Sequence, residues 1–193
     1  MQQDCLNRLT AGIEYDCSAQ GRPKAGLETK GWIINRSDLD RAATVQSGAT
    51  LTSIVLNSGA TSFEIGWIKQ LGTAGSEFTA SDTGRNTFAL KFAARVHGTT
   101  AEDIERVYEL GSGEFIVILE TKFKGANDAS AFKCFGYEQG LVMASGTWAS
   151  GENDGSFIFE LASAEGFGES YPMLNVNLGT YAQTKAAIAA LAA

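Results

Sequence analysis

Hydrophobic and polar residues alternate most regularly in residues 86–97. Every second position there is apolar, and most of the positions between are polar or charged. The apolar positions are Phe88, Leu90, Phe92, Ala94 and Val96. Successive side chains of a β-strand point to opposite faces of the sheet. The pattern therefore predicts a long strand with one face in the core and the other in water.

Shorter apolar runs of strand length recur along the chain between segments rich in Gly, Asn, Asp and Ser. Residues 51–56 and 63–68 are joined by a turn-rich linker, residues 57–61, that suits a hairpin. Residues 115–119 are apolar on both faces, which is typical of a central strand covered above and below. Further strands are expected at residues 6–13, 32–34, 131–135, 141–143, 157–161 and 174–178.

A helix is predicted after the long strand. Thr99 provides an N-cap hydroxyl, and Glu102 lies three residues later, as in a capping box. Apolar residues then follow at helical spacing, and Gly111 is expected to end the helix with a positive φ. An isolated helix of this length is marginal. We therefore expect the helix, at about residues 100–110, to be buried against the sheet.

These elements predict a mainly β protein, a β-sandwich or barrel of about ten strands with one flanking α-helix and with extended arms or loops. The chain is long enough for one domain, residues 1–193. Within it we expect a strand or arm region at 1–48, the sandwich core at 49–178, and a tail at 179–193. The tail is rich in Ala and compatible with a frayed helix.

Charge and hydropathy narrow the function classes. The formal net charge is −7, and Lys and Arg form no cluster along the sequence, so the surface is not expected to attract phosphates. There is neither a signal-peptide pattern nor an apolar run of about 18 residues. We therefore expect folding in the cytoplasm and no membrane partner.

The sequence offers little to catalysis. His97 is the only histidine, it falls on the wet side or at the end of the long strand, and no nucleophile motif accompanies it. Cys5, Cys17 and Cys134 lack metal-site spacing and are expected to be reduced, although a Cys5–Cys17 bridge in an extracellular particle stays an alternative. We predict a non-enzyme without catalytic, cofactor-binding or metal-binding residues, and no cofactor.

Two acidic segments and the three tryptophans are candidate binding sites. Residues 127–128 and 152–155 carry Asn, Asp and Glu oxygens, but without the spacing of an EF-hand, and turn formation explains them better. Trp32 and Trp67 lie among strand-forming apolar residues and are expected in the core. Trp148 lies among Gly, Ala and Ser, and is expected to be exposed or lodged in a neighbouring subunit.

Residues 78–176 resemble a group of phage virion proteins, tail-tube or related tail proteins from phages and prophages of Bacteroidota-type hosts. The most specific segment is Phe135-Gly136-Tyr137-Glu138-Gln139-Gly140-Leu141. The other segments that carry the resemblance are residues 87–92, 101–107, 114–118 and 155–161, and residues 9–17 are similar to the family's opening. Residues 162–166 and 124–131 depart from the family pattern, which leaves a tube or a neck role open.

The resemblance implies a tail-tube-like sandwich with one flanking helix. It implies a homo-oligomeric ring, expected to be a hexamer, that stacks into a tube in the virion after assembly in the host cytoplasm. Its partners would be copies of itself and other tail or neck proteins, and viral DNA would pass through without specific binding. On the channel face, acidic side chains are expected to outnumber basic ones.

Three alternatives stay open. A neck or connector protein would form rings that do not stack. A carbohydrate-binding sandwich would need an exposed aromatic cluster, for which Trp148 and Tyr171 are the candidates. A small hydrolase would need a polar pocket at His97 or a carboxylate pair.

Overall fold

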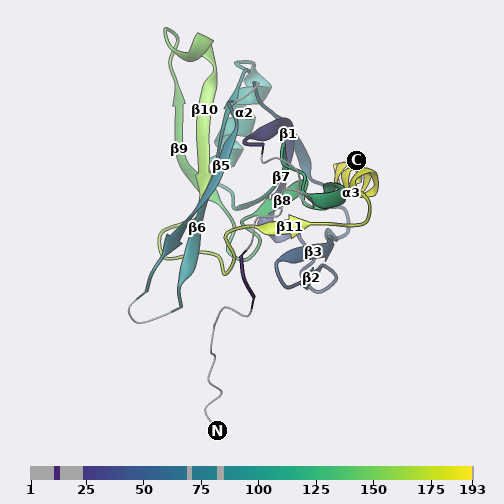
Figure 1. Cartoon of the computed structure of the whole chain (residues 1–193). Helices are drawn as coiled ribbons and strands as arrows, with labels where there is room; N and C mark the ends of the chain where they lie inside the picture. Colours follow the sequence, from purple (N-terminus) through teal and green to yellow (C-terminus); the bar gives the residue numbers. More distant parts are fainter. Residues whose placement is uncertain (1–10, 14–23, 69–70, 82–84, 193) are drawn as a thin grey trace.

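The computed structural model describes residues 11–13, 24–68, 71–81 and 85–192, and folds them into two β-sheets with two α-helices (Figure 1). The mainly β sandwich expected from the sequence is confirmed. Cys5, Cys17 and most of the strand expected at 6–13 lie outside the described residues.

The larger sheet has the strand order β2-β3-β11-β8-β7-β1-β4. All of its neighbouring strands are antiparallel except β11 and β3, which are parallel. Its strands are β1 (Leu27–Asn35), β2 (Val45–Ser47), β3 (Thr50–Ser53), β4 (Phe63–Gly66), β7 (Phe115–Thr121), β8 (Phe132–Phe135) and β11 (Leu174–Val176).

The smaller sheet has the order β5-β6-β10-β9 and is antiparallel throughout. Its strands are β5 (Thr73–Thr79), β6 (Thr87–Val96), β9 (Val142–Trp148) and β10 (Phe157–Ala162). β6 is the long alternating strand predicted from the sequence, with Leu90, Phe92 and Ala94 buried. The hairpins β5–β6 and β9–β10 extend beyond the body of the molecule at opposite ends (Figure 1).

β7 is buried on both faces, as its unbroken apolar sequence predicts. Val117 and Leu119 pack toward the smaller sheet in one core, with Phe92 and Phe159. Ile116 and Ile118 belong to a second core on the opposite face, together with Ile188 of the C-terminal helix α3 (Tyr181–Ala190). The fold thus has three layers: the smaller sheet, the larger sheet, and a cover that includes α3.

The hairpin expected between residues 51–56 and 63–68 is not formed. β3 and β4 lie far apart in the larger sheet, with β11, β8, β7 and β1 between them. The connection runs past the end of α3, where the Ser62 N–H donates to the Leu191 carbonyl. A turn-rich linker is compatible with a hairpin but does not require one, because strand pairing depends on where the apolar faces are covered.

The two helices exchange the roles that the sequence predicted. α2 (Ala101–Leu110) lies where expected, but none of its residues is buried. Its cap is one residue later than predicted, with Thr100 as N-cap and Asp103 as its partner, and Gly111 has an ordinary φ of −70°. The tail expected to fray instead forms the flanking helix α3.

The N-terminus of α3 is closed by a capping box formed by Thr180 and Gln183. The Thr180 hydroxyl accepts from the Gln183 N–H, and the Gln183 side chain accepts from the Thr180 N–H. Ile188 is fully buried. The short 3₁₀ turns η1 (Arg36–Asp38), η2 (Ala126–Asp128) and η3 (Asn153–Gly155) connect other elements.

The acidic segments are turns, as predicted. Asn127, Asp128, Asn153 and Asp154 have φ values between 52° and 57°. Asn and Asp tolerate this left-handed conformation better than other non-glycine residues.

A buried carboxylate anchors α3 to β7. Glu120 accepts hydrogen bonds from Lys124 at 2.6 Å, Tyr181 Oη at 2.6 Å and Lys185 at 2.9 Å. Burial alone would raise the pKa of Glu120, but these three donors outweigh it and hold the pKa below its ordinary value of 4.5. The ionised carboxylate therefore stabilises the folded chain.

Glu120→Gln should lower the free energy of unfolding by about 2 kcal/mol, because it leaves two ammonium groups and a phenol without their charged acceptor. Because the folded pKa of Glu120 is depressed, its contribution should be present above about pH 4.5 and be lost as the pH falls further. Urea unfolding at neutral and acidic pH measures both effects. Glu64→Gln, which removes the exposed Lys30–Glu64 pair, is the matched control and should cost less than about 0.5 kcal/mol. Equal losses would contradict the anchoring role.

Candidate assembly surfaces

The smaller sheet ends in two strands, β5 and β9, whose outer edges no other strand of the described chain covers. In an antiparallel strand the N–H and C=O of one residue point to the same side. The Arg95 carbonyl accepts from the Ile68 N–H on the β5 side, whereas the Leu90 carbonyl accepts from the Ser163 N–H on the β10 side. From this register, the N–H and C=O groups that point out of the β5 edge are those of Ala74, Ser76 and Phe78. Those that point out of the β9 edge are those of Gly146 and Trp148.

One protective feature interrupts the β9 edge. A register shift between Glu160 and Leu161 of β10 gives β9 one extra residue at Ala144. Bulges of this kind are a common way to limit pairing at sheet edges. Ser145–Trp148 lies beyond the bulge and keeps a regular register.

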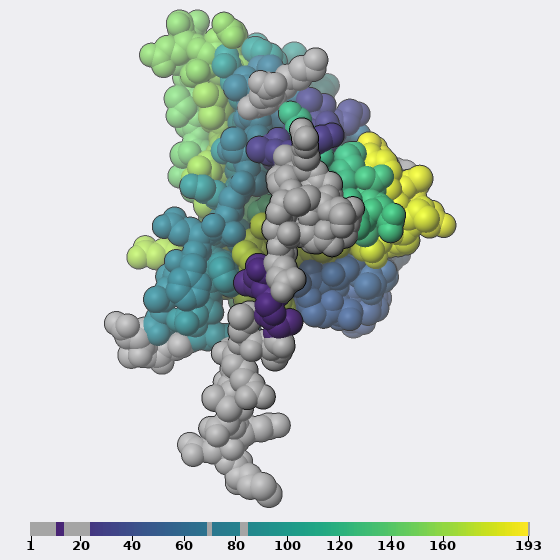
Figure 2. Space-filling view, in the orientation of Figure 1, coloured from purple at the N-terminus to yellow at the C-terminus, as the bar shows by residue number. Residues whose placement is uncertain are grey.

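The outer face of the smaller sheet is small, polar and electrically balanced. Its charged strand residues are Lys91, Arg95, Glu77 and Glu160, two basic and two acidic. Arg95 is neutralised further by Asp154 at 3.0 Å and also bonds Ser156. Most of the other positions are Thr, Ser, Ala or Gly. This face therefore carries mostly small or polar side chains and no excess of either charge. Figure 2 shows the residues of β9–β10 and of β5–β6 at opposite ends of the left side of the molecule.

Helix α2 carries an apolar ridge that faces solvent. Ile104 is 62% exposed and Tyr108, one turn later, is 77% exposed. A groove of about 430 Å³ separates the helix from Trp148 and Phe157 at the end of the smaller sheet. The sequence pattern located this ridge, but buried partners for it are not found in the described part of the chain.

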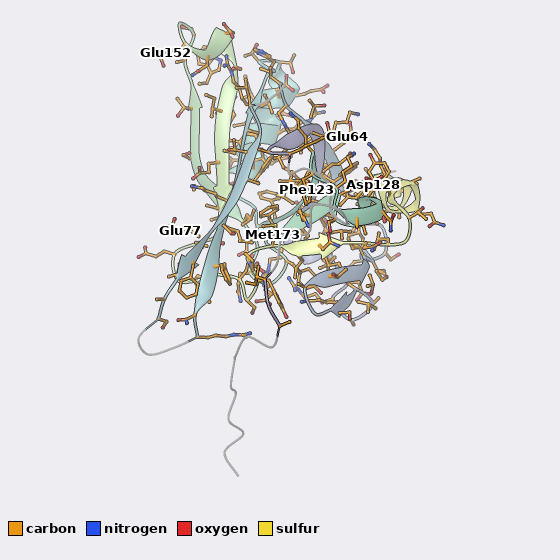
Figure 3. All side chains as sticks on the ribbon, viewed as in Figure 1. Glu64, Glu77, Phe123, Asp128, Glu152 and Met173 are labelled. Atoms are coloured by element: carbon orange, nitrogen blue, oxygen red, sulfur yellow. The ribbon has the colours of Figure 1, made fainter. Side chains whose placement is uncertain are left out.

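A second cavity, also of about 430 Å³, opens beside the start of β5. Leu27, Ala74, Phe135 and Met173 contribute apolar surface to it, and Lys24 and Lys133 also line it. Figure 3 labels Met173 and a further lining residue, Phe123. Sequence reasoning missed this cavity because its lining comes from five separate segments.

The segment that carries the family resemblance forms a tight loop between β8 and β9. Gly136 and Gly140 have φ values of 76° and 83°. A Cβ at Gly136 would lie 2.8 Å from the Phe115 carbonyl, so this position accepts only glycine. Leu141 at the end of the loop is fully buried.

Glu169 caps this loop from a distant part of the chain. Its carboxylate accepts the N–H groups of Glu138, at 2.9 and 3.0 Å, and of Gln139 at 2.9 Å. Burial raises the pKa of Glu169, and these hydrogen bonds offset only part of that effect. The contacts give the motif a structural explanation as a capped turn.

The other sequence candidates do not converge on one site. His97 is exposed just beyond β6 and makes no hydrogen bond to the described residues. Trp32 and Trp67 are buried as predicted, and Trp148 is 53% exposed. Tyr171 packs against the core around Trp32, whereas Trp148 borders the α2 groove, so no shared aromatic platform is formed.

Neither a metal-ligand cluster nor a membrane-spanning helix is found among the described residues. No group of three or more His, Cys, Asp and Glu side chains in this part of the chain is arranged to hold a metal ion. Cys134 is buried, which raises the pKa of its thiol. No described helix combines the length and apolar character needed to span a membrane.

Replacing both Ile104 and Tyr108 by Ser should change the free energy of unfolding of the monomer by less than about 0.5 kcal/mol, since both side chains are already in water. Ile118→Ala, in the core, should cost about 2–5 kcal/mol. Urea unfolding at low protein concentration compares the two. A large loss for the ridge variant would mean that the ridge supports the fold instead of a contact.

Comparisons with protein-family models, with curated proteins and with solved structures gave no match for this chain.

Proposed function

We propose that this protein is a structural subunit of a phage tail tube, which assembles with copies of itself into stacked rings around a DNA channel. The observation that carries the proposal is the smaller sheet, an antiparallel sheet of four strands with both edges open. The resemblance of residues 78–176 to tail proteins supplies the virion context.

An even number of alternating strands lets the sheet continue from one copy to the next. β5 and β9 run in opposite directions, because three antiparallel steps separate them. When copies are related by rotation about an axis, β9 of one copy therefore meets β5 of the next in antiparallel orientation. A head-to-tail contact of this kind forms a ring when the rotation between copies closes, which is the arrangement that we propose.

The open backbone groups also match in side-chain direction. Ala74, Ser76 and Phe78 belong to the same sheet face as Gly146 and Trp148, since all are in register with inward residues of β6 and β10. Pairing these edges would keep the apolar face of one copy continuous with that of the next. The outer face would be continuous in the same way.

The strands of the smaller sheet are staggered, as the strands of closed barrels are. β9 pairs with the part of β10 opposite Lys91–Val96 of β6, whereas β5 pairs with residues 87–93 of β6. A stagger between strands is linked to the strand tilt of closed barrels. The two hairpins project at opposite ends of the sheet (Figure 1), where rings above and below would meet them.

The outer face of the smaller sheet is the surface that we assign to the channel. Its two acidic and two basic strand residues do not give the acidic excess expected from the sequence. A balanced face of small polar side chains still offers no basic patch to hold the phosphate backbone. DNA would slide past such a surface without specific contacts.

Negative-stain electron microscopy of the purified protein over a range of concentrations tests the proposal. We expect rings with a central channel that stack into tubes as the concentration rises. Rings that never stack would favour a neck or connector protein. A persistent monomer would contradict the ring and favour a binding module.

A proline at the β5 edge tests sheet continuation directly. Ser76 is exposed and its N–H points out of the edge, so Ser76→Pro should remove one intersubunit donor while the β5–β6 ladder stays intact. We expect normal circular dichroism and loss of rings by microscopy. Ser76→Ala, which keeps the N–H, should assemble normally. Rings formed by the proline variant would rule out pairing at this edge.

A further inference from the structure

The ridge on α2 and the cavity beside β5 lie next to opposite edges of the smaller sheet. α2 borders β9: its groove is lined by Trp148, and a Cβ at Gly111 would lie 3.8 Å from Met143 Sδ. The cavity is lined by residues 72–75 at the start of β5. An interface that joins β9 of one copy to β5 of the next would bring the ridge and the cavity together.

Both features also lie on the same side of that sheet. The groove beneath α2 is lined by Trp148 and Phe157, which are in register with the inward residue Val96. The cavity is lined by Ala74, in register with the buried Phe92. In a sheet that continues across copies, the ridge of one copy therefore faces the cavity of the next rather than its channel face.

Their heights along the strands agree as well. Pairing the open backbone groups of the two edges places Ala74 beside Trp148 and Ser76 beside Gly146. The cavity is then level with the hairpin end of β9, where Ile104 and Val107 of α2 line the groove.

The charges are complementary. Four carboxylates and one arginine lie on α2. Arg106 pairs with Glu102 and Asp103, and Glu105 and Glu109 form no salt bridge to the residues that the structure describes. Both are exposed, beside the apolar ridge.

The cavity carries the opposite sign. Lys24 and Lys133 line it, and the Lys122 side chain lies beside Gly26, another lining residue. None of these lysines has a salt bridge to the described part of the chain, and the cavity lining contains no carboxylate. Lys133 is partly buried and bonds only the neutral Asn175 side chain, at 3.2 Å.

We propose that, in the assembled ring, the Ile104–Tyr108 ridge of one copy docks into the lysine-rimmed cavity of the next copy. The occupant of the cavity is thus a second copy of this chain, and the inference rests on the proposed ring. The apolar ridge covers Leu27, Phe135 and Met173, and the unpaired acids of α2 meet the unpaired lysines. This contact lies outside the continuous sheet. It favours pairing of β9 with β5 over pairing of two identical edges.

Disulfide trapping between two variants tests the docking geometry. Tyr108→Cys and Met173→Cys are made separately, each with Cys5→Ser and Cys17→Ser, and are mixed under conditions in which the unmodified protein forms rings. We expect a mixed disulfide dimer, with neither variant cross-linking to itself. Self-linked Tyr108→Cys, or rings without any mixed dimer, would overturn the docking while the ring itself stands. Absence of rings in the unmodified protein would overturn both proposals.

Charge reversal gives a second, independent readout. Glu105→Lys should raise the concentration needed for ring formation by about tenfold or more, because it places like charges together at the contact. Glu165→Lys makes the same charge change at an exposed site away from α2 and should have little effect. Adding Lys24→Glu to the Glu105→Lys chain should recover assembly. Equal effects of the two reversals, or no recovery, would contradict the assigned contact.

Discussion

The fold depends on one constraint, the burial of β7 on both of its faces. Seven residues with almost no polar side chain cannot face water on either side, so each face needs its own cover. The smaller sheet covers one face and α3 covers part of the other. The only carboxylate on the strand, Glu120, is buried as well, and two of its three hydrogen-bond donors, Tyr181 and Lys185, come from α3.

The smaller sheet extends beyond the area that covers β7. Phe92, Phe159 and Leu161 are buried where the sheets overlap, whereas Phe78 and Trp148, on the same face of the sheet, are more than half exposed near the hairpin ends. These extensions leave backbone donors and acceptors and aromatic surface in water. In a monomer such edges favour aggregation. The ridge of α2 is a further apolar surface exposed to water. A neighbouring copy in the proposed ring would cover both the ridge and the open edges.

The sequence predicted the elements whose burial is visible in the local spacing of apolar and polar residues. β6 and β7 are of this kind, and so are the turns at Asn127 and Asn153. β5 was missed because Thr73–Thr79 contains one large apolar residue, as an exposed edge strand can. Helical spacing located α2, but spacing cannot say whether a partner from the same chain covers the apolar side. The lysine cavity depends on segments that only the fold brings together.

The distribution of exposed charge suggests how the open edges of the smaller sheet would select their partners in the proposed ring. Edge pairing by backbone groups alone is nearly indifferent to sequence, so it would also join β5 to β5 or β9 to β9. The bulge at Ala144 limits such pairing on one edge. In the proposed contact, Glu105 and Glu109 of α2 would meet Lys24 and Lys133 of the cavity beside β5, so different edges would attract and identical edges would bring like charges together. In the proposed ring, the head-to-tail arrangement would satisfy backbone groups, apolar surface and charge together.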